Sequence, residues 1–155
     1  MIKVIIADDI QILRTGIKAV LSQDSEIEVV GEAGNGREVY EMCVRMKPDV
    51  VLMDMRMPDF DGSYGTRKIK DNLKNIKVLV LTTFDDKETV DRAVASGADG
   101  YTVKETEKDK TGTVITLYLK ESTEDENYDE FLEEYRISGL VKKYSDYIRY
   151  PIRML

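Results

Sequence analysis

Residues 3–9 read Lys-Val-Ile-Ile-Ala-Asp-Asp, and residues 49–54 read Asp-Val-Val-Leu-Met-Asp. Each stretch is a short apolar run that ends in a carboxylate. Uninterrupted apolar runs of this length are typical of parallel strands whose two faces are both covered. Because the carboxyl ends of parallel strands meet at one edge of a sheet, we expect Asp8, Asp9 and Asp54 to lie close together.

Similar apolar runs recur along the chain and alternate with helical patterns. The expected strands are residues 3–7, 27–33, 49–53, 77–81 and 100–103. Apolar residues with the 3.6-residue period of a helix occur at residues 12–21, 39–46 and 90–97. Strands and helices that alternate through right-handed crossovers form a doubly wound α/β sheet with helices on both faces.

The composition excludes several classes of function. The 155 residues include 23 Lys and Arg against 30 Asp and Glu, and the net charge of −7 disfavours a nucleic-acid binder. Histidine is absent, which excludes a catalytic triad or zinc site that depends on imidazole. The single Cys43 cannot form an internal disulfide, and no run approaches the roughly 20 apolar residues of a membrane span. We therefore expect a cytoplasmic protein with no membrane partner.

The chain changes character at about residue 104. Eight of the ten Gly lie before this point, and six of the nine Tyr lie after it. Residues 104–112 are polar and highly charged, as in a linker. We expect a domain at 1–104, a seam at 105–111 and a tail at 112–155, with a strand at 113–119 and a helical region at 128–148.

The three carboxylates at the strand ends suggest a metal site. Carboxylates that lie together repel one another, and their pKa values rise unless a cation compensates. Mg²⁺ prefers oxygen ligands and shares its coordination with phosphate oxygens. A simpler alternative is that Asp8 and Asp9 cap the helix that follows, which is a common role for such a pair.

Together, these residues and their spacing resemble the receiver domain of two-component response regulators. The resemblance covers residues 1 to about 105 and is carried by residues 5–9, 49–58, 61–62, 80–83 and 97–104. Residues 82–86 and 97–101 look most like the subfamily that usually carries a helix-turn-helix DNA-binding domain. The resemblance implies a flavodoxin-like, five-stranded parallel sheet with the strand order 2-1-3-4-5.

The resemblance also implies specific roles at the carboxylate cluster. Asp54 would be the phosphoacceptor, and Mg²⁺ would be bound by Asp9, Asp54 and the backbone carbonyl of Arg56, with Asp8 acting mainly through water. Because the chain has no histidine, the donor phosphohistidine would belong to a partner histidine kinase.

Three further residues would complete the phosphorylation site. Lys104 would neutralise the acyl phosphate, Thr82 would hydrogen-bond a phosphoryl oxygen, and Tyr101 would be the aromatic switch. Each has a simpler interpretation: Lys104 as a solvated linker lysine, Thr82 as a satisfied strand-end residue, and Tyr101 as a half-buried aromatic.

The tail resembles a different protein. Residues 112–121 and 130–152 look like the end of the ATPase domain of the ninety-kilodalton heat-shock chaperone. The earlier segments that would hold Mg-ATP have no counterpart in this chain, so we expect neither nucleotide binding nor ATPase activity. We expect a chimera, natural or engineered, in which a strand and a helix replace the last receiver helix.

Two arrangements of the tail stay open. The tail strand could lie along the sheet edge while a helix at about residues 140–148 covers the bare sheet face. Alternatively, the strand could pair with a second chain, because an open edge is a template for another strand. A homodimer could form through this strand or through the surface of the fourth helix and fifth strand.

The leading functional hypothesis is a phosphorylation-dependent signalling switch that catalyses at most its own phosphorylation and dephosphorylation. The alternative is an inert structural or engineered hybrid whose receiver half folds but no longer signals. A Mg²⁺-dependent phosphohydrolase ranks last, because the sequence offers no acid or base beyond Asp8. Direct DNA binding is not expected, because the helix-turn-helix of the subfamily is missing.

Overall fold

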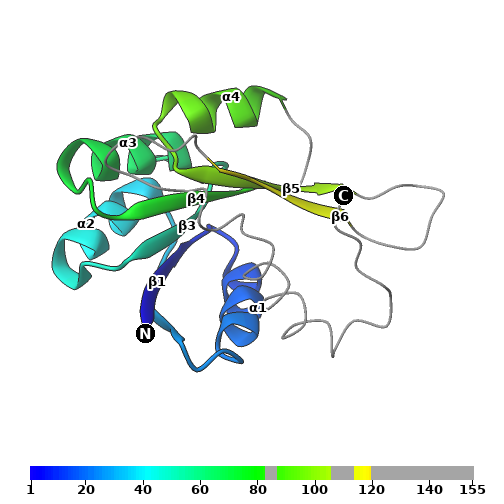
Figure 1. Cartoon of the computed structure of the whole chain (residues 1–155). Helices are drawn as coiled ribbons and strands as arrows, with labels where there is room; N and C mark the ends of the chain where they lie inside the picture. The colour runs from blue at the N-terminus through cyan, green and yellow to red at the C-terminus, as the bar shows by residue number, and fades with distance from the viewer. Residues whose placement is uncertain (83–86, 106–113, 120–155) are drawn as a thin grey trace.

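The computed structural model describes residues 1–82, 87–105 and 114–119, and it contains one six-stranded sheet in the order β2-β1-β3-β4-β5-β6 (Figure 1). The strands are β1 (Ile2–Ala7), β2 (Ile27–Ala33), β3 (Val50–Asp54), β4 (Lys77–Thr82), β5 (Gly100–Glu105) and β6 (Val114–Leu119). Strands β1 to β5 are parallel, and β6 runs antiparallel to β5. The predicted doubly wound sheet with the strand order 2-1-3-4-5 is confirmed.

Four helices among the described residues cover the two faces of this sheet. They are α1 (Gln11–Leu21), α2 (Gly36–Met46), α3 (Gly62–Asn72) and α4 (Lys87–Ala95). Helices α2, α3 and α4 lie side by side on one face, and α1 lies on the other (Figure 1). With 9 to 11 residues each, none of these four helices is long and apolar enough to cross a bilayer.

The hydrophobic core lies between the sheet and helices α2, α3 and α4. It contains strand residues Ile5, Ala7, Val51, Met53, Val78 and Val80 and helix residues Val39, Cys43, Ile69 and Ala93. Ile5 and its neighbour Ile6 are both fully buried, although successive strand residues point to opposite faces. Both faces of β1 are therefore covered at residues 4–7, which explains why this part of the strand is continuously apolar.

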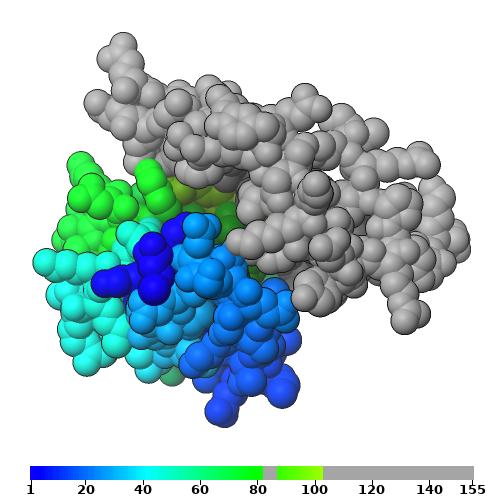
Figure 2. All heavy atoms as spheres, turned by 60° about the horizontal axis from the view of Figure 1, so that its bottom comes forward, coloured from blue at the N-terminus to red at the C-terminus, as the bar shows by residue number. Residues whose placement is uncertain are grey.

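The α1 side of the molecule is much more open. No residue of α1 is buried, and Ile12, Leu13 and Val20 are 74%, 45% and 58% exposed. This side faces the viewer in Figure 2, where α1 is blue. Leu52 and Leu79, which alternate with core residues of β3 and β4, are only half-buried. The two faces of the sheet thus differ strongly in how well the described residues cover them.

Helix α3 has no counterpart among the helical periods in the sequence. Its residues are mostly small or polar, and Ile69 is its one large aliphatic residue in the core. It packs on α2 through glycines: a Cβ atom on Gly36 would lie 2.9 Å from the backbone nitrogen of Gly65. Because the two backbones approach so closely, the contact needs small side chains. The sequence of α3 therefore lacks the periodic large apolar residues that would predict a helix.

The tail strand occupies the edge of the sheet beside β5. Pairs run from Gly100 opposite Leu119 to Glu105 opposite Val114 within the same chain. This pairing agrees with the first of the two tail arrangements as far as the strand is concerned. The predicted seam at 105–111, apart from Glu105, and the predicted tail helix lie outside the described residues.

Strand β5 is longer than predicted, because it continues to Glu105 instead of ending at Val103. Lys104 therefore lies within the strand and not after it. The antiparallel partner β6 supplies the reason, since Lys104 and Glu105 pair with Ile115 and Val114. A sequence read strand by strand does not reveal such a partner.

Candidate functional site

The carboxyl edge of the sheet brings together the three predicted carboxylates. Strands β1 and β3 are neighbours in a register that places Ala7 opposite Met53. Asp8 therefore follows β1 where Asp54 ends β3. One carboxylate oxygen each from Asp8, Asp9 and Asp54 lies within 4.8 Å of the other two. The predicted cluster is formed.

Local hydrogen bonds fix the position of Asp8, which is 7% exposed. Its Oδ1 accepts a hydrogen bond from the backbone N–H of Ile10 at 2.7 Å. Its backbone carbonyl accepts a hydrogen bond from Nη1 of Arg14 at 2.6 Å. The cap of α1 is Ile10, without a side-chain cap, so Asp8 and Asp9 do not cap this helix as the simpler interpretation proposed. One oxygen of Asp8 remains for a ligand or a water.

Arg14 is a supporting residue that the sequence pattern did not reveal. It lies on α1, and its Nε also lies 3.7 Å from the carboxylate of Glu32 in β2. The pKa of the Glu32 carboxyl is lowered, chiefly by a hydrogen bond from Lys18 and also by Arg14. Arg14 lies on α1 and contacts both the Asp8 carbonyl and Glu32 of β2. It therefore ties the loop that carries Asp8 and Asp9 to the sheet.

Asp54 is half-buried, and its environment disfavours the ionised form. Burial is the main cause that raises the pKa of this carboxyl, and the negative charges of Asp8 and Asp9 raise it further. Hydrogen bonds from the backbone N–H groups of Arg56 and Met55 act in the opposite direction. A cation at the cluster would therefore stabilise the carboxylate.

The donor set of the cluster fits Mg²⁺. The ion takes oxygen ligands at 2.0–2.1 Å, so its opposite ligands lie about 4.2 Å apart. Carboxylate oxygens that lie within 4.8 Å of one another need only small side-chain rotations, or a bridging water, to meet that spacing. The backbone of Arg56 lies beside this cluster, because its N–H donates to Asp54.

The start of α3 is fixed against the backbone of Asp54. The backbone N–H of Gly62 donates to the carbonyl of Met55 at 3.3 Å, and a Cβ atom on Gly62 would lie 2.2 Å from the carbonyl oxygen of Asp54. Asp61 caps this helix, because its Oδ1 accepts from the backbone N–H of Tyr64 at 2.9 Å. The other oxygen of Asp61 pairs with Arg92 of α4.

The structure makes residues 61–62 the junction between β3, α3 and α4. An Asp that precedes a helix is a known cap signal, but a partner 31 residues away leaves no local signal.

The structure places the other predicted residues on neighbouring strands. Thr82 ends β4 opposite Val103, and Lys104 follows Val103 in β5, so the backbones of both lie toward the carboxyl edge. The side chains of Thr82 and Lys104 lie outside the described residues. Tyr101 lies further back on β5, is half-buried and packs against the core.

Comparison with known proteins agrees with this geometry. Residues 4–116 match the family described as the response regulator receiver domain. The transcriptional regulatory protein LnrK of Bacillus subtilis is 43% identical over 109 residues, which are 70% of this chain and 50% of LnrK. The chain spans about half the length of such curated relatives.

A solved receiver domain has the same fold. The signal receiver domain of the response regulator NarL from Mycobacterium tuberculosis is 32% identical, with a TM-score of 0.62. The alignment covers 71% of this chain and 86% of the NarL chain. The similarity therefore extends over nearly the whole of that domain.

A chaperone is also similar to part of the chain. Chaperone protein HtpG of Shouchella clausii is 48% identical over 96 residues, which are 62% of this chain and 15% of HtpG. This alignment is longer than the 44 residues of the predicted tail at 112–155. Because the receiver match and the HtpG match together exceed the length of the chain, they overlap, and the boundary at 105–111 does not separate them.

Proposed function

This chain belongs to the response regulator receiver domain family, and from that premise we propose that Asp54 accepts a phosphoryl group from the phosphohistidine of a partner histidine kinase. The observation that carries the proposal is the convergence of Asp8, Asp9 and Asp54 within 4.8 Å at the carboxyl edge of the sheet. Ligands of doubly wound sheets bind at this edge.

The reaction transfers one phosphoryl group between two proteins. A carboxylate oxygen of Asp54 forms a bond to phosphorus while the bond from phosphorus to the imidazole nitrogen of the kinase breaks. The electron pair of the broken bond stays on that imidazole, and an acyl phosphate remains on Asp54. The absence of histidine from this chain is consistent with a donor in trans.

The backbone beside Asp54 positions the proposed nucleophile. Hydrogen bonds from the N–H groups of Met55 and Arg56 hold the Asp54 carboxylate and favour its charged form, against burial and the charges of Asp8 and Asp9. Mg²⁺ would be held by Asp9, Asp54, the carbonyl of Arg56 and, through water, Asp8. When bound, Mg²⁺ neutralises the carboxylates and the phosphoryl oxygens.

The proposed switch involves three residues of β4 and β5. Lys104 pairs with the acyl phosphate, Thr82 donates to a phosphoryl oxygen, and Tyr101 responds by changing its packing. A phosphoryl group adds about −1.5 to −2 charges at one point, which is enough to bias a two-state element. The surface of α4 and β5 would then present a different face to a partner.

Modification by a small phosphodonor tests the proposal. The full chain is incubated with acetyl phosphate and Mg²⁺, and its intact mass is measured. We expect the mass of one phosphoryl group to be added to the wild type and to Asp71→Asn, whose exposed site on α3 is remote from the cluster. We expect no addition to Asp54→Asn, and equal modification of that variant would refute the assignment.

We also propose that the tail derives from a chaperone and carries no activity of its own. The similarity to HtpG and the antiparallel strand β6 beside β5 support a composite chain. The proposal includes no ATPase activity, a cytoplasmic location and no direct binding to DNA. ATP hydrolysis by the purified chain above the rate of a buffer control would contradict it.

The alternative is that the chain is an inert hybrid that no longer signals. Strand β6 favours this alternative because it occupies the edge of β5, and β5 carries Tyr101 and Lys104. In that case the chain would bind Mg²⁺ and become phosphorylated without any change in association. Light scattering before and after phosphorylation separates the two functions, since a switch predicts a change in mass with a partner or a second copy.

A further inference from the structure

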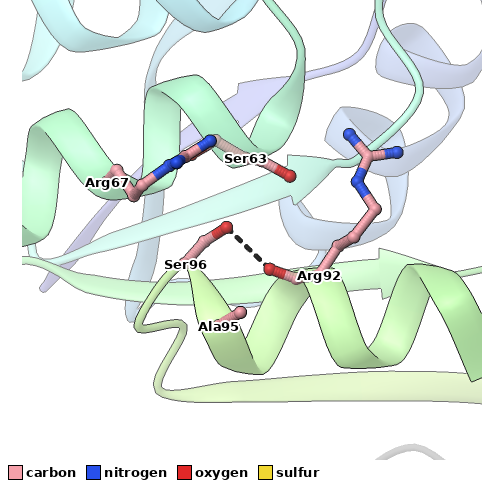
Figure 3. A pocket seen from close by; sticks show the side chains of 5 residues that line it. All are labelled: Ser63, Arg67, Arg92, Ala95 and Ser96. Carbon is pink, nitrogen blue, oxygen red and sulfur yellow. Dashed lines mark hydrogen bonds between the residues drawn. The ribbon is translucent and has the colours of Figure 1, made fainter.

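A polar hollow lies between α3 and α4, and none of its lining residues belongs to the cluster of three carboxylates. It has a volume of about 140 Å³ and is lined by Ser63, Arg67, Arg92, Ala95 and Ser96 (Figure 3). Two of its five lining residues are arginines and two are serines. The proposed phosphorylation chemistry uses none of them.

Ser63 is the most unusual residue of this hollow. It is only 4% exposed, and its Oγ has no hydrogen-bond partner among the described residues. In Figure 3 this oxygen points into the space between the two helices. A buried hydroxyl without a partner is unfavourable, because it has lost its hydrogen bonds to water without replacement. The Oγ of Ser63 therefore lacks a polar partner among the described residues.

The two arginines give the hollow a positive charge. Arg67 is exposed, and its Nε donates a long hydrogen bond of 3.4 Å to the carbonyl of Ser63. Arg92 pairs through Nη2 with Asp61, whose carboxylate neutralises part of its charge. Each guanidinium has five N–H donors, so both keep donors for a further acceptor. Two guanidinium groups against one carboxylate leave a net positive charge.

Ser96 and Ala95 define the floor of the hollow. Oγ of Ser96 donates to the backbone carbonyl of Arg92 at 2.6 Å, so this hydroxyl is already engaged, as the dashed line in Figure 3 shows. Ala95 carries only a methyl group and leaves the space above it open. A water occupies about 30 Å³ of liquid, so the hollow has room for a tetrahedral oxyanion and accompanying waters.

We infer that this hollow binds a small oxyanion, either a free phosphate or the carboxylate or phosphoryl group of a larger molecule. Oγ of Ser63 and the guanidinium groups of Arg67 and Arg92 would donate to its oxygens. Charge-assisted hydrogen bonds of this kind are strong and match oxyanion geometry. The inference does not depend on phosphorylation of Asp54.

An oxyanion at this place would link α3 to α4. Arg67 and Ser63 belong to α3, whereas Arg92 belongs to α4 and is otherwise held only by Asp61 among the described residues. The anion would therefore act as a second tie between these helices, next to the cap of α3.

A titration followed by ¹H–¹⁵N NMR spectroscopy tests the inference. The full chain, kept free of Mg²⁺ by a chelator, receives inorganic phosphate at constant ionic strength, and a parallel sample receives acetate. We expect saturable shifts of the Ser63, Arg67 and Ser96 amides with phosphate. Similar shifts with acetate would extend the ligand to carboxylates, and their absence would restrict it to phosphoryl groups.

Two variants and a control make the result specific. Loss of one charged hydrogen bond costs about tenfold in affinity, so Arg67→Gln should weaken phosphate binding at least to that extent. Ser63→Ala should weaken it less, and Arg45→Gln, which removes an equal charge from an exposed position on α2, should bind like the wild type.

The inference fails if neither anion causes saturable shifts at the hollow. It also fails if Arg67→Gln binds phosphate as tightly as the wild type, or if the shifts appear at residues 8, 9 and 54 instead. Thermal unfolding of each variant shows whether the fold is intact, and Arg67 is exposed, so its replacement leaves the core unchanged.

Discussion

Asp54 lies in surroundings that oppose the negative charge that its proposed role requires. It is half-buried beside two other carboxylates, and it must carry a negative charge to act as a nucleophile. Burial raises its pKa, and the backbone N–H groups of Arg56 and Met55 counteract that rise. A group whose folded-state pKa is raised lowers the free energy of unfolding once the pH exceeds that pKa. Ionised Asp54 therefore destabilises the metal-free fold.

The first prediction follows from this conflict. Asp54→Asn removes the charge but keeps the size of the side chain, so the melting temperature at pH 7 without Mg²⁺ should rise above that of the wild type. Mg²⁺ should raise the melting temperature of the wild type by mass action and have a much smaller effect on the variant. Thermal unfolding by circular dichroism, with and without Mg²⁺, measures both effects. A lower melting temperature for the metal-free variant would contradict this account.

Cys43 is a second buried titratable group, and the proposed phosphorylation does not use it. Burial raises the pKa of its thiol to about 12, and the residue is fully buried in the core. Because the thiolate is the reactive form, native Cys43 should not react with a disulfide reagent at pH 8–9, where free cysteine reacts readily. Full reaction is expected in guanidinium chloride. Rapid labelling of the native protein would mean that α2 does not pack as described.

At the scale of elements, the junction of β3 and α3 is the most constrained contact near the site. Gly62 lies so close to Asp54 that a Cβ atom would be 2.2 Å from its carbonyl oxygen and 2.8 Å from the Cα of Met55. Both are backbone atoms, which cannot rotate away. Strand β3 and the capped helix α3 must therefore move together.

Gly62→Ala should separate α3 from β3. Overpacking of this kind costs about 1–3 kcal/mol, and urea unfolding measures it. The control is Gly16→Ala in α1, where nothing lies within 4 Å of the added Cβ atom. That variant should gain up to about 1 kcal/mol from helix propensity. Equal effects of the two substitutions would show that the close approach at Gly62 is not a constraint.

The elements that could be predicted are those whose sequence pattern is local. Apolar runs predicted β1 to β5, and apolar periods predicted α1, α2 and α4, because local patterns determine which face is buried. Helix α3 left no such period, since its contact with α2 relies on Gly36 and Gly65. The extension of β5 to Glu105 was missed because it depends on β6.

At the candidate site, too, the sequence predicts some residues and not others. Asp8, Asp9 and Asp54 were predictable because the ends of parallel strands meet at one edge whatever the side chains elsewhere. The bond from Arg14 to the carbonyl of Asp8 and the pair of Asp61 with Arg92 were not. These contacts join different elements, and only the packed fold brings them together.

At the scale of the whole molecule, the two faces of the sheet have different degrees of cover. Helices α2, α3 and α4 enclose a core with fully buried residues, whereas α1 leaves Ile12 and Val20 largely exposed. The cluster of Asp8, Asp9 and Asp54 lies at the carboxyl edge of the sheet, and the hollow between α3 and α4 lies on the well-packed face. The chain thus combines a cluster of three carboxylates at the carboxyl edge with an antiparallel edge strand, β6, next to β5.

Mapping of the modified residue shows whether this edge of the sheet makes Asp54 the phosphoacceptor. The chain is treated with acetyl phosphate and Mg²⁺, the acyl phosphate is reduced with borohydride, and peptides are sequenced by mass spectrometry. Reduction converts a phosphorylated aspartate to homoserine. We expect homoserine at position 54 and aspartate at positions 8 and 9. Homoserine at another position, or at none in a protein that binds Mg²⁺, would contradict it.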